Sequence, residues 1–463
     1  MKNITFRWLF LLPLLGTVFL ISCSKEKLLQ NEEGVIKEPT PNVPEDISKK
    51  PPQKVSLQRS KSEVLELATR YFQMVEPEGA TLRSARPEDF NMEYILSSDQ
   101  KLRGSSRNSG NKFADTLLYI VNRFNNNGFC VISGDKRLPD LLAVVENGHL
   151  DPQNVDPQSG VAVFLSRLPI FLARCRDKLD PRFPGGGDPD PRLQPVDTTV
   201  WDSGWHDCEK TPNYVPVTWG QRAPYNNNAP RINGKPAVAG CVAVATAQLL
   251  AAHKYPTWYK GMRLDWNLLT KKGYKTDEEV EKFNRQVAYL LRGIGDDLGN
   301  KWGIGGTGAD DKDVPKVLRS LGYTNVPDCT SYGISDIIYS LCRKRPVLLS
   351  GFSEKYTTGW WLWEETHYSG GHAWICDGYI KQERITEGYI SYGPPNDRRY
   401  KRWRRSEARF FLHCNWGWEG QDDGYFLEGV FDAKRPIRRE QNTRSSREDY
   451  YQYKLSNITN IHR

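Results

Sequence analysis

Residues 180–192 constrain the architecture more than any other stretch, because they read Asp-Pro-Arg-Phe-Pro-Gly-Gly-Gly-Asp-Pro-Asp-Pro-Arg. Proline fixes φ and lacks a backbone N–H, and glycine raises the entropic cost of order, so such a run sustains neither helix nor strand. We therefore expect a linker at residues 180–199, between an N-terminal domain at residues 58–179 and a C-terminal domain at residues 200–463. An exposed linker of this composition is also where proteases cut.

The N-terminus has the pattern of an export signal. A basic start is followed by an apolar run at residues 8–21, which is too short to span a bilayer comfortably and favours a cleaved signal peptide at residues 1–22. The run ends in Leu-Ile-Ser-Cys, which resembles a bacterial lipobox and implies lipid attachment at Cys23. Residues 23–57 are polar and contain five prolines, so we expect a tether. These features predict an exported bacterial lipoprotein, periplasmic or on the cell surface, that processing could release.

Both domains are expected to be α+β. In the N-terminal domain, apolar residues recur at helical spacing near each end, and Asn-Asn-Asn-Gly between two strand-like runs predicts a hairpin. In the C-terminal domain, helical patterns come first and strand patterns follow, which favours an antiparallel sheet with segregated helices. The expected helices are at residues 62–72, 161–179, 241–253, 277–291 and 313–321, and the expected strands at residues 117–121, 128–133, 141–145, 346–352, 372–379, 409–415 and 424–427.

Cys241 is a candidate nucleophile. It follows Gly240 and opens a run of good helix formers, so its sulfur should lie in the first turn of a helix. The unpaired N–H groups there favour an anion, and a nearby imidazolium would lower the thiol pKa further. A free cysteine beside alanines is also commonly a small core residue, so this stretch alone leaves both roles open.

A catalytic thiol needs a base, and the chain has seven histidines. His253 lies on the same helix, roughly 18 Å away at about 1.5 Å per residue, which excludes it. His367, His372 and His413 remain as serious candidates. His372 follows two glycines that would let a substrate backbone approach, whereas His413 fits a packed strand, so we favour His372.

Two further groups complete the expected site. The amide of Asn415 could orient the histidine, and Trp416 could shield that hydrogen bond from water. The oxyanion would be stabilised by the backbone N–H of Cys241 and by a second donor, for which Gln221 is a candidate.

The spacing of the cysteines and the net charge restrict which cofactors and partners we expect. Eight cysteines are left once Cys23 is set aside, and their irregular spacing leaves disulfides possible but unassigned, with no CxxC pair to suggest zinc. A net charge of +8 over 463 residues is mild, so we expect no nucleic-acid partner. No metal or organic cofactor is expected.

Four motifs follow one another along the C-terminal domain: Trp219-x-Gln221-x-x-Pro224-Tyr225-Asn226, Gly240-Cys241-Val242-Ala243 with Ala245-Thr246-Ala247-Gln248, Gly371-His372-Ala373 with Asp377-Gly378-Tyr379, and Asn415-Trp416-Gly417-Trp418. The N-terminal domain contains Tyr119-Ile120-Val121-Asn122 and the stretch at residues 128–137. In this order the four motifs resemble the streptopain family of papain-like cysteine peptidases, and the N-terminal domain resembles that family's propeptide.

The resemblance implies a papain-like catalytic domain with Cys241 as nucleophile and His372 as general base. It places Gln221 at the oxyanion hole and Asn415 with Trp416 beside the histidine. It also implies a zymogen whose own propeptide acts as intramolecular inhibitor until the linker is cut. The expected substrates are proteins or peptides, with an apolar residue preferred on the acyl side of the cut.

Two segments depart from the compact family pattern, and both are expected to flank the cleft. Residues 353–370 lengthen the loop before His372. Residues 381–409 carry nine Lys and Arg against four Asp and Glu. We interpret the second as a solvated face, with a docking surface for acidic substrates or an anionic glycan as the alternative.

The sequence therefore predicts an exported, lipid-anchored cysteine endopeptidase made as a zymogen. Two alternatives remain open. A cysteine acyltransferase or transglutaminase-like enzyme would pass the acyl group to an amine, and a non-catalytic surface binding protein would keep only the fold.

Overall fold

A computed structural model describes the chain from residue 58 onward, with gaps. The described residues are 58–76, 89–96, 116–156, 159–179, 196–358, 365–392, 399–431 and 455–463. The signal peptide, Cys23, the tether and residues 180–195 of the linker lie outside them. No helix among the described residues is both long enough and apolar enough to cross a membrane.

The N-terminal domain has the expected hairpin between two helices. Helix α1 starts at the N-cap Ser60, whose side chain accepts a hydrogen bond from the backbone of Glu63 while Glu63 bonds back to Ser60. The predicted hairpin is confirmed, because β2 and β3 pair antiparallel. The elements are α1 (Lys61–Phe72), β1 (Phe90–Leu96), β2 (Thr116–Arg123), η3 (Phe124–Asn126), β3 (Phe129–Ser133), β4 (Leu141–Val145) and α2 (Gly160–Leu179).

The C-terminal domain has helices first and long antiparallel strands afterwards, as expected. Its helical and short elements are β7 (Arg231–Ile232), β8 (Lys235–Pro236), α3 (Cys241–His253), β9 (Trp258–Tyr259), β10 (Met262–Arg263), α4 (Trp266–Leu269), α5 (Asp277–Asp297), η4 (Asp311–Asp313), α6 (Val314–Ser320), β11 (Thr330–Ser331) and α7 (Ile334–Leu341). The remaining elements are β5 (Val196–Asp202), β6 (His206–Lys210), β12 (Val347–Thr358), β13 (Glu365–Tyr392), β14 (Arg399–Asn415), β15 (Gly424–Leu427), α8 (Glu428–Phe431) and β16 (Ser456–Ile458).

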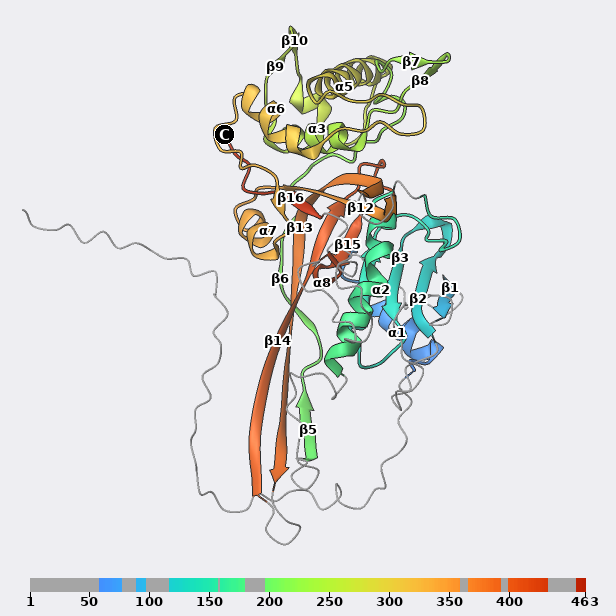
Figure 1. Ribbon diagram of the computed structural model, residues 1–463, viewed down its shortest axis with the longest axis vertical. Helices are drawn as coiled ribbons and strands as arrows, with labels where there is room; N and C mark the ends of the chain where they lie inside the picture. The colour runs from blue at the N-terminus through green and yellow to red at the C-terminus, as the bar shows by residue number, and fades with distance from the viewer. Residues whose placement is uncertain are drawn as a thin grey trace, which may run out of the picture. The chain divides into compact units, whose positions relative to one another are not determined.

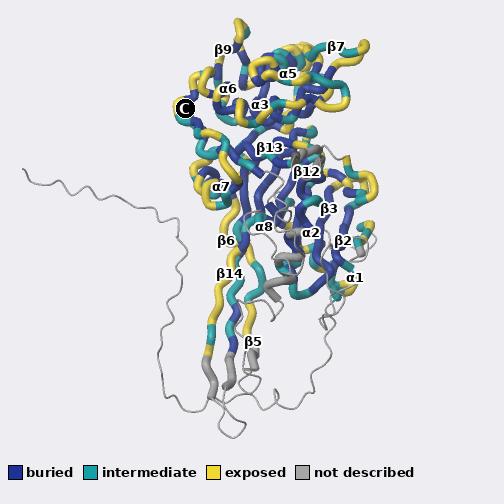
Figure 2. Tube along the Cα trace, in the orientation of Figure 1, coloured by how far each residue is buried: buried dark blue, intermediate teal, exposed yellow. Residues whose placement is uncertain are grey.

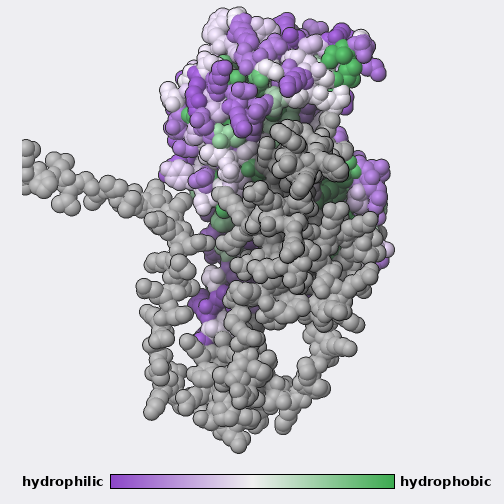
Figure 3. All heavy atoms as spheres, viewed as in Figure 1, coloured by the Kyte–Doolittle hydropathy of each residue, from purple (hydrophilic) through white to green (hydrophobic). Residues whose placement is uncertain are grey.

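One sheet runs through both domains. Its strand order is β1-β2-β3-β4-β15-β14-β13-β12-β16-β11, and the two domains join where β4 pairs antiparallel with β15. The chain from Ser56 onward accordingly forms one compact unit. Helices α3, α5 and α6 lie together beyond the ends of β12 and β13 (Figure 1). The visible surface of that helical part is mostly hydrophilic (Figure 3).

Two hydrophobic cores hold this arrangement. One joins the N-terminal domain to the shared sheet, and the other surrounds α3 and α5. Every residue of α3 from Val242 to Ala251 is buried, which explains why its sequence lacks a polar face (Figure 2). The nucleophile candidate Cys241 therefore begins a helix that is fixed by packing on all sides.

Both segments that depart from the compact family pattern form strands. Residues 353–358 and 365–370 extend β12 and β13 as a paired hairpin, so they are not the loop that we expected. Residues 381–392 and 399–409 extend the β13–β14 ladder, and β5 and β6 pair with β13 along that extension. The polar character of these segments suggested loops, but long-range pairing satisfies their backbone groups.

The basic segment does not flank the cleft. It begins eight residues beyond Ala373, which is about 26 Å along an extended strand. The ladder runs away from α3 in Figure 1. Our expectation that residues 381–409 border the cleft is therefore wrong.

Candidate active site

Cys241 is the first residue of α3, as the sequence predicts. The N-cap Gly240 has φ of 91°, in the region that favours glycine, and no side chain caps this end of the helix. A Cβ on Gly240 would approach Cγ2 of Thr307 to 3.1 Å. The tight turn delivers the sulfur to a helix start whose N–H groups are not occupied by a capping side chain.

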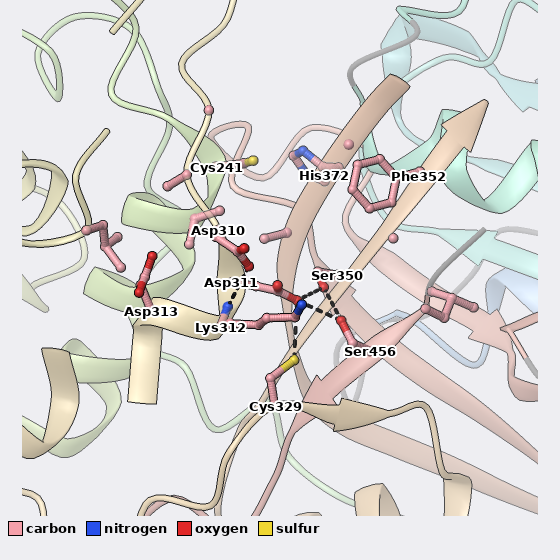
Figure 4. Close-up of a pocket in the computed structure, with 18 of the residues that line it drawn as sticks. Cys241, Asp310, Asp311, Lys312, Asp313, Cys329, Ser350, Phe352, His372 and Ser456 are labelled. Carbon is pink, nitrogen blue, oxygen red and sulfur yellow. Dashed lines mark hydrogen bonds between the residues drawn. The ribbon is translucent and has the colours of Figure 1, made fainter. Parts of the chain in front are cut away.

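His372 lies on β13 and shares one cavity with Cys241. The cavity has a volume of about 1210 Å³, and Figure 4 shows the sulfur of Cys241 and the imidazole of His372 pointing toward one another across it. A backbone hydrogen bond from Ala373, the next residue of β13, acts on the Cys241 thiol. The structure thus brings together two residues that are 131 positions apart in sequence.

The hydrogen bond of His372 fixes its tautomer. Nε2 lies 2.8 Å from the carbonyl oxygen of Trp416. A carbonyl can only accept, so Nε2 carries the proton and Nδ1 of the neutral ring is left as the acceptor. The side chain is 3 % exposed, and burial lowers the pKa of His372 to about 4.

The thiol is neutral as well. Burial raises the pKa of Cys241 above its usual value, although backbone hydrogen bonds from Ala373, Val242 and Cys241 itself act in the opposite direction. We expected a lowered pKa at the start of a helix, whereas burial raises it. Desolvation of the charged form outweighs the helix terminus here, because no imidazolium compensates it.

Asn415 does not hydrogen bond to His372, contrary to our expectation. Its Nδ2 donates to the carbonyl of Val217 at 2.9 Å, and its Oδ1 accepts from Nε2 of Gln248 at 3.0 Å. Oδ1 also accepts from the backbone N–H of Gly417 at 3.2 Å. The group that orients His372 is instead the backbone carbonyl of the next residue, Trp416.

Tryptophans surround the imidazole. The ring centroids of Trp416 and Trp418 each lie 6.2 Å from that of His372, and the Trp374 ring lies 6.3 Å away. Trp416 is 1 % exposed. The hydrogen bond from His372 to the Trp416 carbonyl is therefore kept from water, whereas the bond to Asn415 that Trp416 was expected to shield is not formed.

Gln221 is buried near the nucleophile, but it does not line the cavity in the described part of the chain. Its backbone carbonyl accepts a hydrogen bond from the N–H of Ala239 at 2.9 Å. This bond ties the Gln221 segment to the turn that precedes Cys241.

His413, the other strong base candidate, faces a different environment. Its Nδ1 lies 2.6 Å from a carboxylate oxygen of Asp377, and its Nε2 lies 3.1 Å from the amide of Asn213. Burial alone would lower its pKa, but the carboxylates of Asp377, Glu146 and Asp423 together outweigh burial and raise it. His413 is not among the described residues that line the cavity.

The N-terminal domain reaches the site at Trp416. A Cβ on Gly160, the first residue of α2, would lie 1.7 Å from the Trp416 ring, so only glycine fits there. The charge of Asp156 also raises the pKa of His372 against the larger effect of burial. The sequence analysis missed both residues, since a glycine at the start of a helix carries no local sign of a distant tryptophan.

A buried ion pair also joins the two domains. Arg409 of β14 contacts Asp140 at 2.5 Å and the hydroxyl of Tyr71 at 3.2 Å. Arg409 was counted in the basic segment, where we expected a solvated face, yet it is 8 % exposed.

Comparison with known proteins gives matches over both domains. Residues 219–426 match the peptidase C10 family, and residues 56–168 match the Spi protease inhibitor family. The chain is 23 % identical to streptopain of Streptococcus pyogenes serotype M28 (strain MGAS6180) over 374 residues, which cover 71 % of this chain and 77 % of streptopain.

Two proteins from other organisms are also similar to the chain. The chain is 23 % identical to the thiol protease/hemagglutinin PrtT of Porphyromonas gingivalis, covering 67 % of this chain and 34 % of PrtT. A solved fragment of Prevotella intermedia prointerpain A is 19 % identical, with a TM-score of 0.48, covering 76 % of this chain and 96 % of the fragment.

Proposed function

The chain belongs to the peptidase C10 family of cysteine peptidases, and we propose that it is the zymogen of an endopeptidase with Cys241 as nucleophile and His372 as base. One observation carries this proposal. The Nε2–H of His372 is committed to the Trp416 carbonyl, which leaves Nδ1 free to take the thiol proton in a cavity that both side chains line.

The proposed reaction has two halves. Nδ1 of His372 takes the proton of the Cys241 thiol, the sulfur forms a bond to the peptide carbonyl carbon, and the carbonyl oxygen becomes an oxyanion. As the C–N bond breaks, His372 returns the proton to the leaving amine. Water then attacks the thioester and gives a proton to His372, the C–S bond breaks, and the acid product leaves as the thiol is restored.

The oxyanion would be stabilised at the start of α3. The backbone N–H of Cys241 belongs to a helix end that no side chain caps, and it is the first donor. Gln221 is the proposed second donor, supported by the hydrogen bond that ties its segment to Ala239. Asn415 would act indirectly, by fixing the strand end that carries the Trp416 carbonyl.

The experiment uses the chain without its leader, residues 24–463, and the variant Cys241→Ala. Cys208→Ala is the matched control, because Cys208 is an exposed free cysteine. We expect wild type and Cys208→Ala to process themselves and to react with a thiol-directed peptidase inhibitor, and Cys241→Ala to do neither. A folded wild type that shows neither activity would overturn the proposal. A labelled amine in the product would identify an acyltransferase instead.

We propose that the N-terminal domain, which matches the Spi protease inhibitor family, keeps the enzyme inactive through its contact with Trp416. The support is the fit of Gly160 against the indole, since a Cβ there would lie 1.7 Å from the ring. Gly160→Ala should weaken docking of the N-terminal domain and speed self-processing. Gly305→Ala is the control, because a Cβ there meets no atom within 4 Å. Equal processing of both variants would contradict this role.

We also propose that lipid on Cys23 anchors the exported protein in a membrane. The support is the apolar run at residues 8–21 and the Leu-Ile-Ser-Cys sequence after it. Cells grown with a labelled fatty acid should label wild type but not Cys23→Ala, and only wild type should sediment with membranes. Equal sedimentation of both proteins would argue against the anchor.

A further inference from the structure

The cavity next to Cys241 and His372 extends well beyond these two side chains. Its opposite wall is formed by residues 307–313, by Cys329, and by Ser350 and Ser456 from β12 and β16 (Figure 4). No residue of the N-terminal domain lines it within the described parts of the chain. A substrate that lies across Cys241 would therefore place neighbouring side chains against this wall.

One carboxylate dominates the wall. Oδ2 of Asp311 accepts hydrogen bonds from the Ser350 hydroxyl, from the Ser456 hydroxyl at 2.7 Å and from the Cys329 thiol at 3.4 Å. These donors come from three separate stretches of chain, so the carboxylate is held in a fixed place. Burial would raise its pKa, but the hydroxyl donors outweigh burial and hold the pKa of Asp311 below its usual value.

The charge of Asp311 has no counter-ion in the described part of the chain. The Ser350, Ser456 and Cys329 donors are neutral, and the fourth interacting side chain, that of Asp310, is itself acidic. Neither Lys301 nor Lys312, which are exposed residues of the same cavity, forms an ion pair with Asp311. A half-buried carboxylate without a cationic partner is costly, and a cationic group brought by a ligand would relieve that cost.

Asp311 lies in the same cavity as Cys241 and acts on it electrostatically. Burial is the main cause of the raised pKa of Cys241, and the negative charge of Asp311 adds to it. Apolar side chains line the cavity as well, among them Leu298, Phe352 and Leu455. A carboxylate beside apolar walls matches a long side chain with a hydrocarbon stem and a charged head.

We propose that Asp311 is a specificity-determining residue, and that this cavity takes a lysine or arginine side chain of the peptide substrate. The inference rests on the proposed function of Cys241 and names the substrate class of that site. It departs from the apolar preference implied by the family resemblance. Arginine should fit best, because its planar guanidinium can donate to a carboxylate through two N–H groups.

The test compares matched peptides on the activated enzyme. One series carries arginine, citrulline or leucine in turn at each of four positions on the acyl side of a scissile bond. Citrulline has nearly the shape of arginine without the charge. At one position, wild type should cleave the arginine peptide at least about tenfold faster in kcat/KM than the citrulline peptide. Asp311→Asn should remove most of this ratio, and the leucine peptide measures any general change of activity in the variant.

The control is Asp313→Asn, which removes a carboxylate from an exposed residue that lines the same cavity but accepts no hydrogen bond from Ser350 or Ser456. It should keep the arginine preference. Should Asp311→Asn fail to fold, the arginine-to-citrulline ratio of wild type still decides. A ratio near one at every position overturns the inference, as does an arginine preference that persists in folded Asp311→Asn. If no peptide is cleaved and Cys241 does not react with a thiol-directed inhibitor, the proposed function itself fails.

Discussion

His372 and His413 are two buried histidines on adjacent strands, and their hydrogen-bond partners make them chemical opposites. His372 is 3 % exposed and His413 is 4 % exposed. His372 donates to a neutral carbonyl, and burial lowers its pKa to about 4. His413 contacts the Asp377 carboxylate, and this carboxylate together with those of Glu146 and Asp423 outweighs burial and raises its pKa. Burial beside a carbonyl thus favours a neutral proton acceptor, and burial beside carboxylates favours the protonated ring.

The largest expected effect separates the two histidines by activity. His372→Gln should lower kcat/KM by about a thousandfold, because the proton acceptor for the thiol is lost. His413→Gln should stay within about tenfold once folded, because His413 lies outside the cavity. Steady-state cleavage of one peptide by the activated variants measures this. A folded His413→Gln that is inactive, beside an active His372→Gln, would reverse the assignment.

The next effect concerns stability. Asp377→Asn should destabilise the chain by about 3–5 kcal/mol, since it removes the buried carboxylate that contacts the buried His413 ring at 2.6 Å. His372→Gln should cost less, about 1–3 kcal/mol, because only a hydrogen bond to a neutral carbonyl is disturbed. Denaturation in urea compares the two variants with wild type. A greater loss in His372→Gln would show that the Asp377–His413 contact is not an ion pair.

How much of this the sequence predicts depends on how local each feature is. The position of Cys241 could be predicted, because a glycine before a run of helix formers defines a helix start within a few residues. The choice of His372 over His413 also rested on neighbours in sequence, the two glycines before it. Asn415 was placed beside the histidine by resemblance. Two of its actual partners, Gln248 and Val217, are 167 and 198 positions away, and no local pattern reveals these long-range hydrogen bonds.

That the two domains share one sheet could not be predicted from the sequence, for a similar reason. The composition of the linker suggested two separate segments of structure, but the pairing of β4 with β15 joins residues 143–145 to residues 424–426. Which strand edges meet is decided by packing of the whole molecule. The charged stretch at residues 381–409 was interpreted from its polarity, whereas its backbone pairs with β5 and β6 as well as within its own hairpin.

The pH dependence of stability should show directly that the pKa values of His372 and His413 shift in opposite directions. His372 has a pKa of about 4 when folded, against an ordinary value of 6.5. Between these values the unfolded chain binds more protons, so this residue makes stability rise with pH, by about 3 kcal/mol in all. His413 has a raised pKa, so its contribution is complete below the ordinary value and is lost as pH rises through the folded pKa.

Urea midpoints measured from pH 4 to pH 9, a range of about five units, test these slopes. His372→Gln should flatten the acid limb of the wild-type curve, and His413→Gln should flatten the alkaline limb. If both variants change the same limb, the two histidines do not differ in charge as described.

The smallest effect concerns the hydrogen bond that links α3, the helix of Cys241, to the strand end that holds His372. Gln248 lies on α3 with Cys241, is fully buried, and donates to Oδ1 of Asn415, next to the Trp416 carbonyl that holds His372. Gln248→Leu removes this donor and loosens the strand end. We expect kcat to fall about tenfold with little change in KM, because positioning and not substrate binding is disturbed.

Gln286→Leu is the matched control for Gln248→Leu. Gln286 is also a buried glutamine, but it accepts a hydrogen bond from the backbone of Asp265 and lies on α5, away from the cavity lining. Its loss should lower stability with kcat nearly unchanged. If Gln248→Leu changes only KM, or if both variants lose kcat equally, the glutamine on α3 only packs the core. A selective loss of kcat would show that His372 depends on the nucleophile's own helix for its orientation, a dependence that His413 does not share.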